Sequence, residues 1–129
     1  VSANQNLSGE DLRNSLRASL GQWYRSRALD KLKEKTKRYA SIIGVSPASV
    51  TLKDYKARWG SCSSSGDVTY NWRIIIAPHQ IVDYIVVHEL CHLLEHNHGP
   101  DYWKHVELVI PNFKDCRQWL KVNGERLTI

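Results

Sequence analysis

The sequence contains no methionine, and no apolar stretch in it is long enough to span a membrane. The longest such stretches, Ile74–Ala77 and Ile85–Val87, fall far short of the ~18 residues that a membrane-spanning helix needs. No basic segment leads into an apolar region at the start of the chain, so we expect neither a secretory signal nor a membrane association. Because the chain begins at Val1 and has no methionine, we expect it to have been processed or cut from a longer protein.

Cysteine is scarce as well. The chain has three cysteines, Cys62, Cys91 and Cys116, which are spread widely along it. An odd and scattered set does not build a disulfide framework. We interpret Cys91 and Cys62 as packed thiols, although Cys62 could also approach the cleft, and Cys116 has no evident partner. The simplest setting for such a chain is a reducing, cytoplasmic one.

The remaining composition is that of an ordinary globular protein. The chain has 129 residues, of which 42% are hydrophobic and 24% are charged, with a formal net charge of +5. We expect a single catalytic domain over residues 1–129, with residues 1–8 frayed. The order of the predicted elements, helix then strands then helices, indicates the α+β class.

Hydrophobic spacing places these elements. Leu12, Leu16, Leu20 and Tyr24 recur at helical intervals and begin a long N-terminal helix, which Gly44 is placed to end. Alternating residues in 51–76 predict a small antiparallel sheet of about three strands, with the strongest strand over 68–76. The later elements are a buried helix over 81–96 and two C-terminal helices over 101–109 and 115–122.

The sequence His88-Glu89-Leu90-Cys91-His92 is an H-E-x-x-H motif inside the predicted buried helix. Residues four apart lie on one face of a helix, so His88 and His92 can offer imidazole nitrogens to one metal ion. Glu89 projects beside the first ligand, where its carboxylate can act on a water molecule as a general base. Zinc is the metal that this pattern favours, although such histidines also bind cobalt, nickel or manganese.

A catalytic zinc needs a third protein ligand and one open position. His96 is eight residues beyond His88, roughly 12 Å along a straight helix, so one metal ion cannot bind both of them. His98 lies after the predicted helix end, where Gly99 and Pro100 let the chain turn back, and we favour it over His96. Glu107 remains a weaker alternative.

Several short motifs resemble those of the YgjP-like metallopeptidases, in the same order and at similar spacing. They are Trp59-Gly60-Ser61-Cys62, Asn71-Trp72-Arg73, Ala77-Pro78, Asp83-Tyr84, the H-E-x-x-H motif, Asn97-His98 and Tyr102-Trp103. The resemblance covers residues 12–124 and extends more distantly to the SprT and WLM peptidases, which act around DNA–protein adducts.

This resemblance implies a zincin-like fold in which His88, His92 and His98 hold zinc and Glu89 is the general base. Family members usually carry a strand-rich segment before this region, so the chain resembles the C-terminal part of a longer protein. Gly99 stands where the family more often has serine.

Other polar residues are weaker candidates for the site. Arg58, Tyr70 and Arg73 are possible oxyanion stabilisers, but each is also an ordinary strand residue. Asp101 can orient a ligand histidine, or simply begin a helix. An extended peptide can pair with a sheet edge beside the active helix, either at 68–76 or at 56–61.

We therefore expect a zinc metallopeptidase that acts on a peptide or protein substrate. One alternative is a metal-dependent hydrolase of nucleotide phosphoanhydrides, and another is a DNA-associated protease or binding module. The stretch Arg25–Arg38 carries seven basic residues, which form either a solvated helix face or a weak nucleic-acid footprint. The oligomeric state is not indicated by the sequence.

Overall fold

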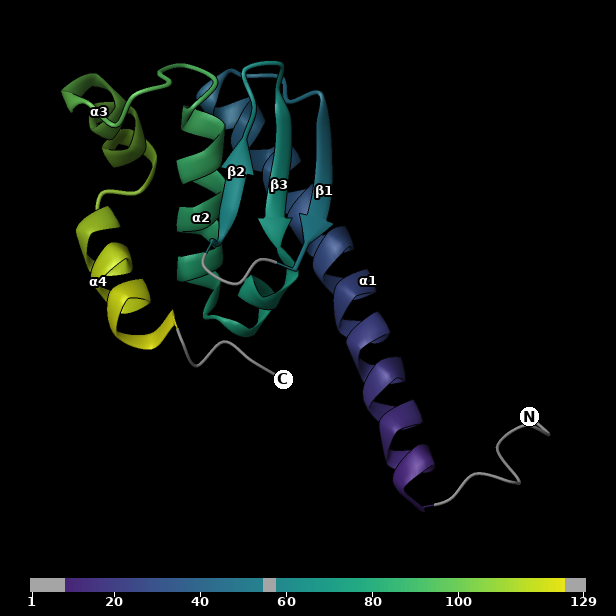
Figure 1. Ribbon diagram of the computed structural model, residues 1–129. Helices are drawn as coiled ribbons and strands as arrows, with labels where there is room; N and C mark the ends of the chain where they lie inside the picture. The colour runs from purple at the N-terminus through teal and green to yellow at the C-terminus, as the bar shows by residue number, and fades with distance from the viewer. Residues whose placement is uncertain (1–8, 55–57, 125–129) are drawn as a thin grey trace.

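The computed structural model describes residues 9–54 and 58–124, and Figure 1 shows their arrangement. A long helix comes first, three short strands and a 3-10 turn follow, and three further helices complete the described chain. The elements are α1 (Gly9–Ile43), β1 (Ser49–Lys53), β2 (Gly60–Cys62), β3 (Asp67–Asn71), η2 (Trp72–Ile76), α2 (His79–Cys91), α3 (Pro100–Val109) and α4 (Phe113–Asn123). The α+β class expected from the sequence is confirmed. Residues 1–8, for which fraying was expected, lie outside the described residues.

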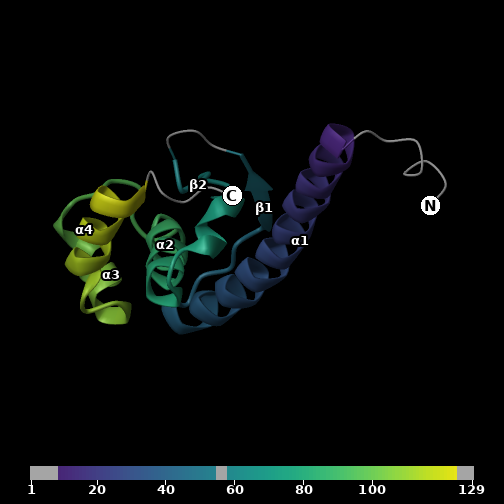
Figure 2. The same ribbon diagram turned by 90° about the horizontal axis from the view of Figure 1, so that it is seen from below.

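The long helix α1 ends at the predicted glycine. Gly44 has a φ of 88°, a left-handed conformation that glycine adopts without strain. Its N–H and that of Val45 donate to the Ala40 carbonyl at 2.8 and 3.0 Å. The second half of α1 buries Ala28 and Leu32, whereas Leu12, Leu16 and Leu20 in its first half are 44 to 56% exposed. The first half of α1 therefore projects beyond the domain (Figures 1 and 2).

The three strands form a sheet in the order β1-β3-β2. β2 and β3 pair antiparallel, but β1 and β3 pair parallel, with Val50 opposite Val68. The expected number of strands is correct, and the expectation that all of them pair antiparallel is wrong. The reason lies in the strand order: β1 and β2 point in opposite directions, and each pairs with a different side of β3.

The strand predicted over 68–76 ends early. β3 stops at Asn71, and the apolar residues that follow form η2 instead of extending the strand. The Asn71 side chain accepts a hydrogen bond from the Arg73 N–H at 3.1 Å, and its Nδ2 donates to the Arg58 carbonyl at 3.0 Å. A buried side chain that satisfies two backbone groups can turn the chain away from the sheet.

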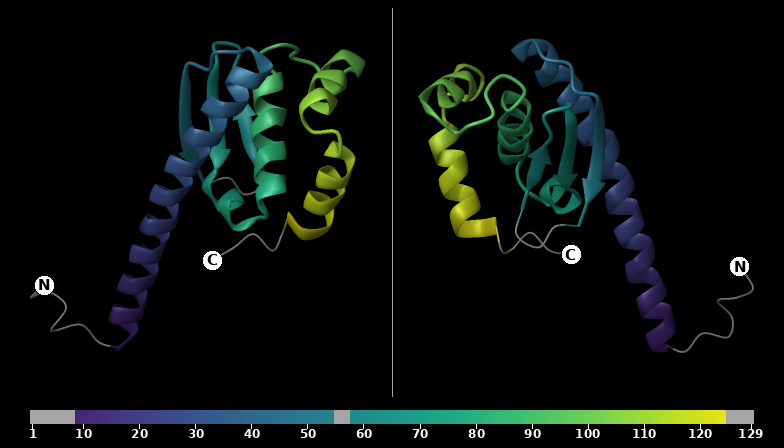
Figure 3. Two further views of the ribbon diagram at one scale, coloured as in Figure 1. Left: turned by 180° about the vertical axis from the view of Figure 1, so that it is seen from behind. Right: turned by 45° about the horizontal axis from the view of Figure 1, so that its top comes forward.

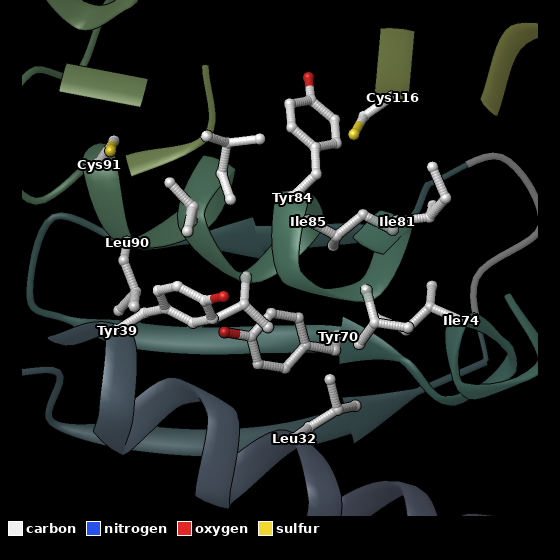
Figure 4. Packing of buried hydrophobic residues seen from close by; sticks show 14 of the residues in the cluster. Leu32, Tyr39, Tyr70, Ile74, Ile81, Tyr84, Ile85, Leu90, Cys91 and Cys116 are labelled. Atoms are coloured by element: carbon white, nitrogen blue, oxygen red, sulfur yellow. The ribbon is translucent and has the colours of Figure 1, made fainter. Parts of the chain in front are cut away.

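The helices α1 and α2 cover one face of the sheet, and they lie in front of it when the molecule is seen from behind (Figure 3). α3 and α4 pack on the side of α2 that faces away from α1 (Figure 2). The core lies between these layers, with Leu32 from α1, Tyr70 from β3 and Leu90 from α2 all fully buried (Figure 4). The Tyr70 hydroxyl shares a hydrogen bond of 2.9 Å with the Thr36 hydroxyl.

The buried helix that carries the H-E-x-x-H motif is shorter than expected. α2 ends at Cys91, and the chain then makes turns over residues 92–94 instead of continuing to His96. His92, the first residue after α2, keeps a right-handed helical conformation, with φ −66° and ψ −16°. The i, i+4 relationship to His88 therefore survives the helix end. Among the described residues, no helix is both long and apolar enough to cross a membrane.

Candidate metal centre

Three histidine side chains meet where α2 ends and α3 begins. His88 lies in the last turn of α2, His92 follows that helix directly, and His98 lies in the loop before α3. One ring nitrogen from each lies within 4.8 Å of the other two. The ring centroids of His92 and His98 are 4.5 Å apart, and that of His88 lies 5.3 Å from His92 and 5.2 Å from His98. The structure therefore brings together the three residues that the sequence nominated.

The early end of α2 and the docking of α3 explain how His98 reaches the other two histidines. Tyr102 of α3 is fully buried, its hydroxyl donates to the His88 carbonyl at 2.7 Å, and its ring stacks on that of His92. Trp103, also from α3, stacks on the His98 ring with centroids 5.9 Å apart. Two aromatic side chains of one helix thus hold two of the histidine rings in place.

The two rival ligand candidates lie elsewhere. His96 is exposed in the loop after α2, and Glu107 is exposed on α3. Neither belongs to a group of potential metal ligands within residues 9–54 and 58–124, where the grouping found is that of His88, His92 and His98.

The chemistry of these three side chains fits a metal ion. Burial lowers the pKa of His92 and of His98, so both rings favour the neutral form that a metal ligand requires. The Nδ1 of His92 lies 3.3 Å from the Glu95 carbonyl, and that of His88 lies 3.2 Å from Glu89 Oε2. Such contacts at Nδ1 fix each ring and leave its Nε2 available as a ligand.

Glu89 lies on the sheet side of the same helix. Its side chain is buried, with 6% of the residue exposed, and it faces the backbone of Gly60 in β2. A Cβ placed at position 60 would lie 3.2 Å from Glu89 Oε2 and 3.0 Å from the Thr69 carbonyl oxygen. In the sequence Gly60 stands out only as part of a family motif, although a glycine within a strand is itself a sign of close backbone approach.

Two cavities meet at Tyr84 and His88. One, of about 220 Å³, contains Glu89 and Gly60 and is also bordered by Arg58. The other, of about 380 Å³, is bordered by His98 and by Arg117 from α4. Burial raises the pKa of Tyr84, which borders both cavities, to about 12. Arg117 was not among the residues expected at the site, because nothing in the sequence shows that α4 reaches the histidines.

The other candidates are placed differently. Tyr70 is buried in the core on Thr36, and Arg73 forms an ion pair with Asp54, so neither borders these cavities. Arg58 does border the cavity that holds Glu89. Asp101 lies in the first turn of α3 and is exposed, as a residue that begins a helix would be.

The cysteines are placed as packed thiols. Cys91 and Cys116 are buried, Cys62 is partly buried, and all three are free. Burial raises the pKa of Cys91 to about 11; burial first, and then the nearby Glu89 carboxylate, raise that of Cys62 to about 11. Thiols with such pKa values are poor nucleophiles at neutral pH.

Comparisons with known proteins show a family and related folds. Residues 2–123 match the family described as YgjP-like, metallopeptidase domain. The fold is similar to that of the metallopeptidase zymogen abylysin of Pyrococcus abyssi, with a TM-score of 0.62 and 23% identity, over 70% of this chain and 93% of that one. It is also similar to the zymogen jannalysin of Methanocaldococcus jannaschii, with a TM-score of 0.53 and 18% identity, over 59% of this chain and 78% of that one. A comparison with curated proteins gives no match.

The fold and the histidine cluster are thus those of a metallopeptidase domain. The chain belongs to the YgjP-like metallopeptidase family, as its sequence motifs indicated.

Proposed function

We propose that this domain hydrolyses peptide bonds with a zinc ion held by His88, His92 and His98, and with Glu89 as the general base. The observation that carries this proposal is the placement of a buried carboxylate directly beside a cluster of three imidazoles whose nitrogens lie within 4.8 Å of one another. Three neutral nitrogen donors suit zinc and leave one position for water or substrate. Neither a thiol nor a carboxylate belongs to this ligand group.

A zinc ion bound there would supply a Lewis acid able to lower the pKa of water to about 7. Glu89 accepts the proton of the attacking water on its carboxylate and then donates it to the nitrogen of the departing amine. The contact between Glu89 Oε2 and His88 Nδ1 holds the carboxylate in position, and the Gly60 backbone closes the space behind it.

The substrate peptide pairs with β2 in this proposal. The sequence alone allows either 68–76 or 56–61 as the binding edge. β3 has a neighbour on both sides, whereas β2 lies at the edge of the described sheet and packs against α2. An extended peptide that adds to β2 would therefore run beside Gly60 and Glu89, where main-chain hydrogen bonds supply affinity.

The decisive experiment compares Glu89→Gln with Glu107→Gln, a matched change on the exposed surface of α3. We expect Glu89→Gln to keep its metal and to lose at least about a hundredfold in peptidase activity, because a general base contributes 10²–10⁴-fold. Glu107→Gln should keep both metal and activity. Full activity of Glu89→Gln would contradict the mechanism.

The same assay separates the alternatives. Nucleoside triphosphates are offered in parallel with a denatured protein, and their hydrolysis without peptide cleavage would favour the phosphoanhydride hydrolase. A nucleic-acid association through Arg25–Arg38 would appear as salt-dependent binding. Two of its basic residues already form ion pairs: Lys35 with Asp83 at 2.5 Å and Arg25 with Asp54 at 3.8 Å.

A further inference from the structure

Arg117 of α4 reaches into the surroundings of the histidine cluster. Its guanidinium Cζ lies 4.6 Å from the centroid of the Trp103 ring, and Trp103 itself stacks on Phe113 with centroids 5.1 Å apart. A planar guanidinium on an aromatic ring loses little further freedom when it binds a carboxylate. Arg117 borders the same cavity as His88 and His98, and its charge helps to lower the pKa of His98.

Arg117 borders a second cavity as well as the one beside His98. That second cavity, of about 400 Å³, is lined by Lys114, Arg117, Gln118 and Lys121. Lys114, Arg117 and Lys121 are spaced by three and four residues, so they share one side of the helix. We call these three residues the basic face of α4.

Within the part of the chain that the structure describes, no salt bridge neutralises the positive charge of this face. The ion pairs found within residues 9–54 and 58–124 include none of its three residues. Glu89, the buried carboxylate of the site, borders the other cavity. Among the described residues, the basic face therefore presents cations without a salt bridge, and Arg117 and Glu89 border different cavities that share His88.

We propose that the basic face of α4 determines substrate specificity by binding acidic side chains of the substrate polypeptide close to the bond that is cut. This inference rests on the proposed peptidase function. An acidic peptide is favoured over other anions because Arg117 shares a cavity with His88 and His98. A substrate side-chain carboxylate bound at Arg117 would lie close, along the same polypeptide, to the peptide bond held at the histidines. Lys114 and Lys121 extend the positive surface for further acidic residues of the substrate.

The first test measures selectivity. A quenched fluorescent peptide, whose cut site has been located by mass spectrometry, is prepared with Glu or with Gln at the positions flanking that site. We expect the unaltered protein to cleave the Glu form with a kcat/KM about tenfold above that of the Gln form, since one charge-assisted hydrogen bond gives about that factor. Arg117→Gln should bring this ratio close to one, and Arg117→Glu should reverse it.

The matched control is Lys104→Gln, which removes one positive charge from the exposed surface of α3 and borders neither cavity. This variant should keep the preference for the Glu form. Because the measured quantity is a ratio of two substrates within one variant, a general loss of activity does not imitate the expected result. Unchanged ratios in Arg117→Gln and Arg117→Glu would overturn the proposal.

A binding measurement distinguishes failure of this inference from failure of the proposed function. Fluorescence anisotropy of the labelled Glu and Gln peptides with the Glu89→Gln protein requires no cleavage. Tighter binding of the Glu form that is lost in Arg117→Gln supports the basic face even if no peptide is cut. Equal binding of the Glu and Gln peptides overturns the proposed specificity. It is also overturned if the protein binds a single-stranded oligothymidylate through Arg117 but does not discriminate between the two peptides.

Discussion

Gly60 of β2 lies so close to Glu89 of α2 that a Cβ at position 60 would stand 3.1 Å from the glutamate Cγ and 3.2 Å from its Oε2. The strand backbone and the buried carboxylate are therefore in contact, and the smallest residue is the one that permits it. On the other side, Oε2 contacts His88 Nδ1 at 3.2 Å. The carboxylate is held between the sheet and the histidine cluster.

Substitution of this glycine should damage catalysis more than folding. In Gly60→Ala the new Cβ would lie 3.0 Å from the Thr69 carbonyl oxygen, which belongs to the backbone of the paired strand β3 and cannot easily move. The Glu89 side chain must therefore be displaced instead. We expect peptidase activity to fall at least about tenfold, since small misplacements of a catalytic group are costly. The metal content should be retained, as measured by atomic absorption.

The control for that substitution is Gly21→Ala on α1. A Cβ at Gly21 would meet nothing within 4 Å, and alanine favours a helix over glycine by about 1 kcal/mol. Activity should stay unchanged in Gly21→Ala. If Gly60→Ala were equally active, Glu89 would not need the position that the structure gives it.

The second prediction concerns which histidine, His98 or His96, is the third metal ligand. We expect His98→Ala to lose the metal and His96→Ala to keep it, because only the former removes a member of the cluster. The two residues lie in the same loop and are both exposed, so the pair is a matched one. Metal analysis of the purified variants checks this, and the reverse pattern would refute the assignment of His98.

Removal of the metal should destabilise the fold. Two of the three histidines belong to α2 or its end, and the third belongs to the loop before α3, so a bound ion connects the two helices. A ligand that binds the folded chain alone stabilises it, by about 4 kcal/mol when its concentration is a thousand times the Kd. Treatment with EDTA should therefore lower the Tm in a thermal melt. An unchanged melting curve would count against a metal ion that is part of the native structure.

The sequence was most informative where a local rule determines the geometry. The i, i+4 spacing of His88 and His92 needs only a helix, and Gly44 ends α1 because of its own conformational freedom. His98 was preferred because His96 lies too far along the helix from His88 and because Gly99 and Pro100 let the chain turn back, and the structure places His98 with the other two. These inferences required no knowledge of distant contacts.

Other features depend on partners that the local sequence does not show. The parallel pairing of β1 with β3 follows from the strand order of the whole sheet, and η2 follows from the hydrogen bonds of Asn71. The stripe of Leu12, Leu16 and Leu20 predicted a helix correctly, but not that these side chains are exposed. Arg117 reaches the site only because α4 packs beside α2.

Alkaline pH should destabilise the domain. Burial raises the pKa of Cys91 to about 11, whereas an unfolded thiol has a pKa of about 8.5. The native state therefore holds this proton more tightly than the unfolded state does. The stabilisation is fully present below about pH 8.5 and is lost as the pH rises through about 11. Burial also raises the pKa of Tyr70, which adds to the loss at the upper end of this range.

Urea unfolding at pH 7, 9 and 11 measures this loss. Cys91→Ala should be less stable than the unaltered protein at pH 7, because it removes a buried side chain. Its stability should nevertheless fall less steeply between pH 8.5 and 11. An identical slope in the two proteins would show that the Cys91 thiol does not contribute to the pH dependence.

The last prediction concerns Gly124, where α4 ends against Trp59, just before β2. A Cβ at Gly124 would stand 2.7 Å from Cζ2 of Trp59, the residue before Gly60, which borders the cavity containing Glu89. An indole ring cannot bend away from such a contact as a flexible side chain would, so either Trp59 or the end of α4 must move. Overpacking of this kind typically costs about 1–3 kcal/mol.

We therefore expect Gly124→Ala to lower the free energy of unfolding by about that amount and to reduce peptidase activity at the same time, because Trp59 and Glu89 border one cavity. Gly99→Ala provides the comparison, since a Cβ there would meet nothing within 4 Å and the φ of −85° at this position suits alanine. If Gly124→Ala lost stability but kept full activity, Trp59 would be a packing residue alone. A joint loss would show that the docking of α4 maintains the shape of the cavity around the general base.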